Sequence, residues 1–127
     1  MEVDGRCFFI NVNSNTNFEA SKKECTKRLG GKGKLYEPRR NSLTEKIRWE
    51  ASLRVNDDIG YYVGIKKVNG KFVYDSDGTL VSKSLKWADG YPVPQGDCVQ
   101  MVNGKLINSD CGVDVHEICE YDRGILF

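Results

Sequence analysis

Cysteine is the residue type in this sequence with the clearest chemical meaning, because five cysteines occur in 127 residues, at positions 7, 25, 98, 111 and 119. Cytosolic proteins are kept reduced and rarely accumulate thiols without a metal or catalytic reason, so this density favours disulfide bonds and an extracellular location. A zinc site is the weaker alternative. The sequence has no CxxC motif, and its only histidine, His116, lies three residues before Cys119.

Catalytic chemistry finds little support in the remaining residues. No G-x-S-x-G, H-E-x-x-H or glycine-rich phosphate loop is present, and we expect His116 to lie at the surface. The neighbouring carboxylates Asp57-Asp58 and Asp75/Asp77 fall in turn-like sequence, where aspartate caps helices and forms turns without an acid–base role. The sequence therefore predicts a protein that is not an enzyme.

Positive charge is concentrated in the first half of the chain, although the net charge is only +1. Residues 1–56 carry 12 basic and 7 acidic side chains, whereas residues 57–127 carry 7 and 11. One basic segment, residues 22–40, contains Lys22, Lys23, Lys27, Arg28, Lys32, Lys34, Arg39 and Arg40. It is a candidate site for a polyanion such as a sulfated glycan or a nucleic acid, although we favour the simpler interpretation of a solvated helix face.

Length and composition indicate a single soluble domain spanning residues 1–127. The chain is 39% hydrophobic and 29% charged, as in ordinary globular proteins. No apolar stretch approaches the roughly 20 residues of a membrane span, so we expect no membrane insertion. The start of the chain, residues 1–5, lacks the basic and apolar regions of a secretory signal.

The first half of the chain predicts a short strand and two helices. Residues 6–11 form the strand, and the polar residues 11–17 form a turn that caps a helix over residues 17–29, where Phe18, Ser21, Cys25 and Leu29 recur at helical spacing. Residues 35–38 are extended and end at a proline. A second amphipathic helix begins near Ser42, with apolar positions Leu43, Ile47, Ala51 and Leu53.

The second half predicts strands and one long loop. Residues 61–65 read as a buried strand, and Asn69-Gly70 predicts a hairpin over residues 65–73, since Asn-Gly tolerates the positive φ angles of tight turns. Residues 75–97 form a long loop region with Trp87 as its large apolar anchor. Strands at 98–102 and 117–121 follow, with a second hairpin turn at Asn103-Gly104. The predicted fold class is α+β, with two helices, an antiparallel sheet and a long loop region.

The order of these segments resembles the C-type lectin-like domain over residues 7–121. Phe18-Glu19-Ala20 followed by Cys25 is similar to the first helix of that family, and residues 35–41 are similar to the segment that joins its helices. Tyr62-Val63-Gly64-Ile65 corresponds to its Trp-Ile-Gly-Leu signature. The later part matches in order and approximate spacing through residues 72–78, Trp87, Gly90, Pro92, Asp97-Cys98-Val99, Cys111 and Ile118-Cys119-Glu120.

The resemblance implies a disulfide-stapled fold with Cys25 bonded to Cys119 and Cys98 bonded to Cys111. Each bond would stabilise the domain by roughly 3 to 5 kcal/mol in the chain-entropy account. Cys7 is left over. Longer family members pair this position with a cysteine slightly upstream, and this sequence has none there. It pairs beyond this chain, links two chains into a dimer, or stays free.

The resemblance also raises the question of calcium, which is held by side-chain oxygens in the sugar-binding members. Their Glu-Pro-Asn or Gln-Pro-Asp triplet becomes Tyr91-Pro92-Val93 here, or Val93-Pro94-Gln95 if the second proline aligns. Gly96 stands in place of a glutamate, and Ile107-Asn108-Ser109 replaces Trp-Asn-Asp. Because calcium takes about six to eight oxygen ligands, we expect no ordinary calcium site and no required cofactor.

A weaker group of oxygen donors remains around the implied Cys98–Cys111 bond, which would bring two segments close together: Gln95, Asp97, Asn108 and Asp110. These residues are the weak candidates for a calcium site. In the alternative interpretation, Asp97 and Asp110 are solvated loop acids and Asn108 hydrogen-bonds to loop backbone.

Three functions follow from these observations. The first is a non-catalytic extracellular recognition module that binds a protein or glycan through its loop surface, residues 74–97, without the usual calcium site. Its candidate ligand-binding residues are Tyr91, Val93, Gln95, Asp97, Asn108 and Asp110. Trp87 is a further candidate, although we favour a core position for it. The alternatives are a calcium-dependent lectin with a variant Tyr-Pro-Val triplet and a polyanion binder that uses the basic segment.

Overall fold

The structure is a computed structural model that describes residues 2–3, 6–39 and 59–122. The helix predicted to begin near Ser42 lies outside them. None of the helices in the described residues is long and apolar enough to cross a membrane.

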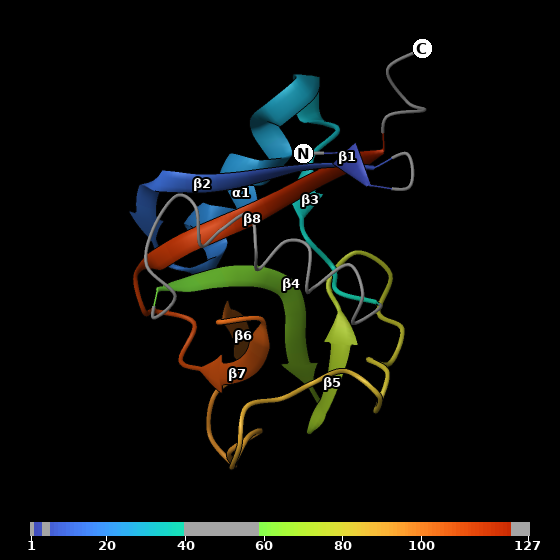
Figure 1. The fold of residues 1–127 in the computed structure, drawn as a ribbon, viewed down its shortest axis with the longest axis vertical. Coiled ribbons are helices and arrows are strands. Elements are labelled where there is room, and N and C mark those ends of the chain that lie inside the picture. The colour runs from blue at the N-terminus through green and yellow to red at the C-terminus, as the bar shows by residue number, and fades with distance from the viewer. Residues whose placement is uncertain (1, 4–5, 40–58, 123–127) are drawn as a thin grey trace.

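One sheet of eight strands organises the described chain, in the order β1-β2-β8-β4-β6-β7, with β3 beside β8 and β5 beside β4. The elements are β1 (Glu2–Val3), β2 (Arg6–Thr16), α1 (Phe18–Lys27), a 3-10 turn η1 (Arg28–Gly31), β3 (Lys34–Leu35), β4 (Gly60–Val68), β5 (Lys71–Tyr74), β6 (Cys98–Val102), β7 (Lys105–Ser109) and β8 (Val115–Asp122). Figure 1 shows β2 and β8 running side by side at one end of the molecule, with the β6–β7 hairpin and the long loop toward the other. The α+β class is therefore confirmed.

The sheet differs from the purely antiparallel one that we expected in a single pairing. Strands β4 and β8 are parallel, with Tyr61 opposite His116 and Tyr62 opposite Glu117. The last strand, β8, lies between β2 and β4. It is antiparallel to β2, a strand distant in sequence, and this direction makes it parallel to β4. His116 is half-buried there, with its ring 5.8 Å from that of Tyr61, and is less exposed than expected.

The predicted first helix is confirmed. The side-chain oxygen of Asn17 accepts a hydrogen bond from the backbone N–H of Ala20 at 3.0 Å, which caps the start of α1. The polar residues before this helix, which we predicted as a turn over 11–17, belong to β2 as far as Thr16. Pairing with β8 resumes at Thr16 after a register shift that begins at Asn11, so these residues form the irregular end of a strand.

Both predicted Asn-Gly hairpins are present. Asn69 and Asn103 have φ angles of 53°, and the glycines that follow have φ angles of 78° and 75°. Two consecutive positive φ angles give the tight turn whose twist matches that of paired strands. The turns join β4 to β5 and β6 to β7.

The core forms on both faces of β4. Tyr61, Val63 and Ile65 point into the larger apolar cluster, whereas Tyr62 lies in a second cluster with Phe18 under α1. This alternation follows from the two-residue period of a strand. All four side chains are at most 4% exposed, so β4 is the central strand of the fold.

The two disulfides predicted from the resemblance are present. Cys25 is bonded to Cys119 with a Cα–Cα distance of 5.2 Å, and Cys98 is bonded to Cys111 with a Cα–Cα distance of 5.1 Å. The first joins α1 to β8, and the second joins the start of β6 to the turn after β7. Cys7 is half-buried on β2 and forms no disulfide within the described residues.

Candidate ligand-binding surface

A polar hollow of about 590 Å³ lies beside the Cys98–Cys111 disulfide. Its lining residues are Pro94, Gln95, Gly96, Asp97, Asp110 and Cys111. Three of the residues predicted from the sequence, Gln95, Asp97 and Asp110, are thus brought to one place, as the implied disulfide suggested. All three are exposed.

Asn108 of β7 lies next to this hollow, and its side-chain amide is hydrogen-bonded to the loop backbone. Its side chain is buried, and its oxygen accepts a hydrogen bond from the N–H of Val93 at 2.8 Å. Its amide nitrogen donates to the carbonyl oxygens of Val93 at 2.9 Å, Gly96 at 3.0 Å and Gln95 at 3.3 Å. The side-chain amide therefore fastens the loop to β7, which confirms the alternative interpretation of this residue.

Gly96 packs so closely on β7 that a side chain does not fit. Its φ angle is 125°, a conformation that residues with side chains rarely adopt. A Cβ atom at this position would lie 2.9 Å from the backbone nitrogen of Ser109 and 3.1 Å from the carbonyl carbon of Asn108. The position that resembles a glutamate site in the family therefore has no room for that glutamate in this conformation.

Two further contacts hold the walls of the hollow. Lys67 of β4 donates through its ammonium to the carbonyl oxygen of Pro94 at 2.9 Å. The hydroxyl of Tyr62 donates to the carbonyl oxygen of Val113 and also lies 3.3 Å from that of the lining residue Cys111. Burial, assisted by the charges of Asp110 and Asp114, raises the pKa of Tyr62 to about 12, so its hydroxyl stays a donor at physiological pH.

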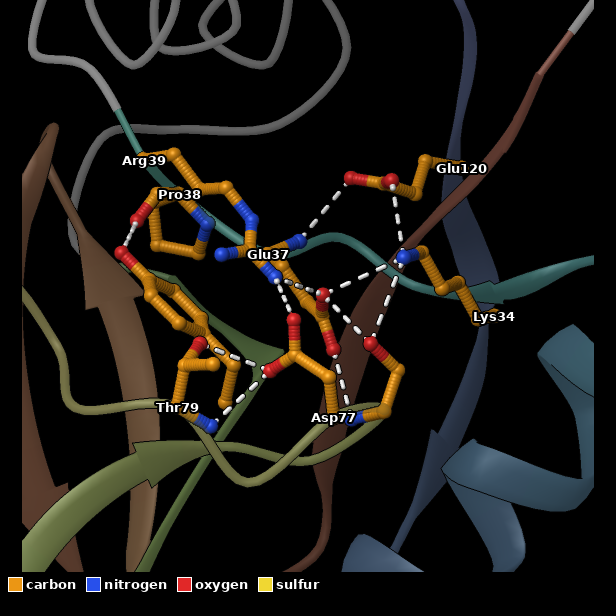
Figure 2. Close-up of polar contacts among 9 residues, drawn as sticks. Lys34, Glu37, Pro38, Arg39, Asp77, Thr79 and Glu120 are labelled. Carbon is orange, nitrogen blue, oxygen red and sulfur yellow. Dashed lines mark hydrogen bonds and ion pairs between the residues drawn. The ribbon is translucent and has the colours of Figure 1, made fainter.

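The beginning of the long loop is fixed by a polar cluster around the buried Glu37, the Glu37 cluster, which consists of Lys34, Glu37, Arg39, Ser76 and Asp77 (Figure 2). The carboxylate of Glu37 accepts hydrogen bonds from Arg39 at 2.9 Å, from Lys34 at 3.1 Å and from the N–H and hydroxyl of Ser76 at 2.8 Å each. These charge-assisted bonds offset the cost of burying Glu37. The cluster ties the loop to the segment before the undescribed residues.

The same contacts use much of the basic segment. Lys34 and Arg39 bind Glu37, and Lys22 pairs with Asp75 at 3.0 Å. The guanidinium of Arg39 also lies over the ring of Tyr74, 3.9 Å from its centroid. Cations that already have carboxylate partners gain less from an added polyanion, and this applies to three of the eight basic residues of the segment. Arg40 lies outside the described residues.

A second hollow, the Trp87 cleft, lies between β5 and the long loop and has a volume of about 410 Å³. Its lining residues are Lys71, Phe72, Leu80, Val81, Ser82, Lys83, Trp87 and Pro92. Trp87 packs against the core from a half-buried position, so it serves both as core and as surface. Most of the other lining residues fall within the predicted loop surface, residues 74–97, but none of them was a candidate contact, although the apolar pair Leu80-Val81 in a polar run was an available signal.

Tyr91 and Val93, the remaining predicted site residues, lie outside the lining of both hollows. Tyr91 is 37% exposed and precedes Pro92 at the edge of the Trp87 cleft. Val93 is half-buried and contributes its backbone to Asn108. Of the two, only Tyr91 presents a largely accessible side chain.

Comparison with known proteins places this arrangement in a family. The family model of the lectin C-type domain matches residues 14–121, and the chain belongs to this family. The family is generally one of non-catalytic binding domains, typically extracellular or part of ectodomains. No curated protein sequence gives a significant match.

Solved structures share the fold at low sequence identity. Human lithostathine is 18% identical with a TM-score of 0.82, over 96% of this chain and 87% of that chain. The mouse scavenger receptor C-type lectin carbohydrate-recognition domain is 19% identical with a TM-score of 0.81, over 97% and 93%. The C-type lectin domain of murine dendritic cell inhibitory receptor 2, solved in complex with an N-glycan, is 19% identical with a TM-score of 0.79, over 96% and 94%.

In and beside the polar hollow, the positions that resemble the family's calcium ligands supply few free side-chain oxygens. Val93 offers no side-chain oxygen, Gly96 has no room for one, and the amide of Asn108 is already bonded to the loop. Within the described residues, no group of three or more His, Cys, Asp or Glu side chains is placed to hold a metal. Asp97 and Asp110 remain as exposed acids.

Proposed function

We propose that this chain is one extracellular, non-catalytic recognition domain that binds a protein or glycan ligand through its loop surface without calcium. The observation that supports the proposal best is the amide of Asn108, whose four hydrogen bonds hold the loop in place of a metal ion. A loop that protein hydrogen bonds already hold in one conformation depends less on an ion to present its side chains. Gln95, Asp97 and Asp110 around the polar hollow, together with Tyr91, are the proposed contact residues.

The experiment is a binding screen of the whole chain against a glycan array and an array of extracellular protein ectodomains, each run with calcium and with EGTA. We expect at least one ligand whose binding is unchanged by EGTA and weakened by Tyr91→Ala or Asp97→Ala. Lys23→Ala, an exposed residue on α1, is the matched control and should bind as the unmodified chain does. Binding that disappears in EGTA would contradict the proposal.

A variant calcium-dependent lectin is the second candidate, because two exposed carboxylates, Asp97 and Asp110, line the same hollow. Its discriminating feature is loss of glycan binding in EGTA together with loss in Asp97→Asn. The polyanion interpretation is weaker. Lys22, Lys34 and Arg39 already pair with carboxylates, which leaves Lys23 and Lys27 as exposed cations without an ion pair in the described chain.

A further inference from the structure

The Trp87 cleft is built on backbone contacts that fix its shape. The N–H of Val81 donates to the carbonyl oxygen of Phe72 at 3.1 Å, and Trp87 forms a β-bridge with Leu106 of β7. The rings of Phe72 and Trp87 pack with centroids 5.0 Å apart and planes at 55°. The cleft is therefore preformed, with an aromatic floor held by the sheet.

The lining of the cleft and the residue before Pro92 expose apolar surface. Leu80 is 64% exposed, the largest exposure among the large apolar side chains of the described chain. Tyr91, which precedes the lining residue Pro92, is 37% exposed. Clustered aromatic and aliphatic side chains around a hollow are typical of protein–protein binding sites.

The charge of the cleft has one sign. Among the lining residues that the structure describes, Lys71 and Lys83 are the ionisable ones, and both are exposed. Within the part of the chain that the structure describes, neither makes an ion pair, in contrast to Lys22 and Lys34. An apolar floor beside two unpaired ammonium groups complements a ligand that is both apolar and acidic.

Hydroxyl-rich ligands fit this lining less well than peptides do. Among the described lining residues, Ser82 has the one hydroxyl group, which is already hydrogen-bonded to that of Ser84 at 2.7 Å. Apart from the two lysines, this lining offers few hydrogen-bonding side chains, so a sugar that entered the cleft would leave many of its hydroxyl groups bonded only to water. A large apolar side chain has no such groups to satisfy.

We infer that the Trp87 cleft binds an acidic segment of a partner protein. One aromatic or large aliphatic side chain of that segment would contact Phe72, Leu80 and Trp87, and flanking Asp or Glu carboxylates would pair with Lys71 and Lys83. This inference rests on the proposed function and specifies the partner class for one part of the loop surface.

The test uses phage-displayed random peptides selected in parallel against the whole chain and against its Lys71→Glu/Lys83→Glu variant. Both lysines are exposed, so the fold should tolerate the change. We expect the unmodified chain to enrich peptides with an apolar anchor beside Asp or Glu, and the variant to enrich Lys or Arg at the same places. A synthetic peptide of the first consensus should bind about tenfold more weakly to Leu80→Ser and to the charge-reversed variant.

The control is Lys23→Glu/Lys27→Glu, which reverses two exposed charges on α1 and should leave peptide affinity unchanged. No enriched peptides, a consensus without acidic residues, or binding that the charge reversal leaves intact would overturn the inference. Retention of a heparin oligosaccharide that Lys71→Glu/Lys83→Glu abolishes would assign the lysines to a glycan and overturn it too. If the inference about the cleft fails in this way, ligand binding that resists EGTA and depends on Asp97 would still support the proposed function.

Discussion

Asn108 and Val93 form a two-way pair, in which the side-chain amide of Asn108 accepts from the Val93 N–H at 2.8 Å and donates to the Val93 carbonyl oxygen at 2.9 Å. The amide thereby pairs with a loop residue as a neighbouring strand would. The same nitrogen also reaches the carbonyl oxygens of Gln95 and Gly96. One buried side chain thus organises the loop that carries the proposed contacts.

Replacing Asn108 by Asp should destabilise the domain by about 2–4 kcal/mol, because a carboxylate would face three carbonyl oxygens without protons to donate. Urea unfolding followed by circular dichroism measures the change. The control is Asn15→Asp, at an exposed residue of β2, which should alter the free energy of unfolding little. An Asn108→Asp variant as stable as the unmodified chain would contradict the role given to this amide.

For Asn108, the sequence predicted a place at the site but did not decide between two roles for its side chain. Its identity was found through the family resemblance, and hydrogen bonding to backbone was considered as an alternative to metal binding. The choice between these roles depends on how the loop packs against β7. That packing involves Val93 to Gly96, which lie 12 to 15 positions before Asn108 in the sequence. The local pattern does not contain that information.

The fold itself was more predictable where local chemistry decides it. The Asn-Gly turns and the Asn17 cap depend on a few consecutive residues, and each was confirmed. The Glu37 cluster joins residues about 40 positions apart, and the parallel β4–β8 pairing depends on the whole topology. Such long-range relationships leave no periodic trace in the sequence.

Removing the two disulfides should have unequal effects. Cys25–Cys119 closes a separation of 94 residues, against 13 for Cys98–Cys111, so the chain-entropy account gives about 4.7 and about 2.9 kcal/mol. Urea unfolding of each double-Ala variant should show the larger loss for Cys25–Cys119. The reverse order would mean that native contacts, and not loop closure, dominate.

Mass mapping of the unreduced protein provides the matching check on Cys7. We expect it free, capped by a small thiol or bridging two chains, because both internal bonds are formed without it. A Cys7 link to any of the four paired cysteines would contradict the disulfide arrangement.

Stability should depend on pH through Asp75, whose side chain is 11% exposed and lies 3.0 Å from both Lys22 and Lys66. Burial opposes its ionisation, but hydrogen bonds from these lysines prevail and lower its pKa. A lowered folded-state pKa stabilises the protein above the unfolded value of about 3.9, and this contribution is lost as the pH falls through the folded value. The stability difference between the unmodified chain and Asp75→Asn should therefore shrink below about pH 4. A difference that is independent of pH would contradict the ion pairs.

Lys22 and Lys23 offer a matched pair for testing the basic segment. Lys22→Ala should cost about 1 kcal/mol because it removes a partner of Asp75, whereas Lys23→Ala should cost little because its side chain is exposed without an ion pair in the described chain. Thermal unfolding measures both. Equal stabilities, with equal loss of retention on a heparin column, would show instead that both lysines serve a polyanion site.

The most direct test of the central claim, that the loop surface binds its ligand without a metal, is the Tm measured in calcium and in EGTA. Calcium at about 2 mM, against a site with a Kd of about 20 µM, would stabilise the folded state by roughly 2.7 kcal/mol and raise the Tm by several degrees. The bonds of Asn108 and the packing of Gly96 leave too few oxygens for such a site, so we predict a Tm that is the same in calcium and in EGTA. A rise of several degrees in calcium, reversed by EGTA and lost in Asp97→Ala/Asp110→Ala, would contradict the account and establish a variant calcium-dependent lectin.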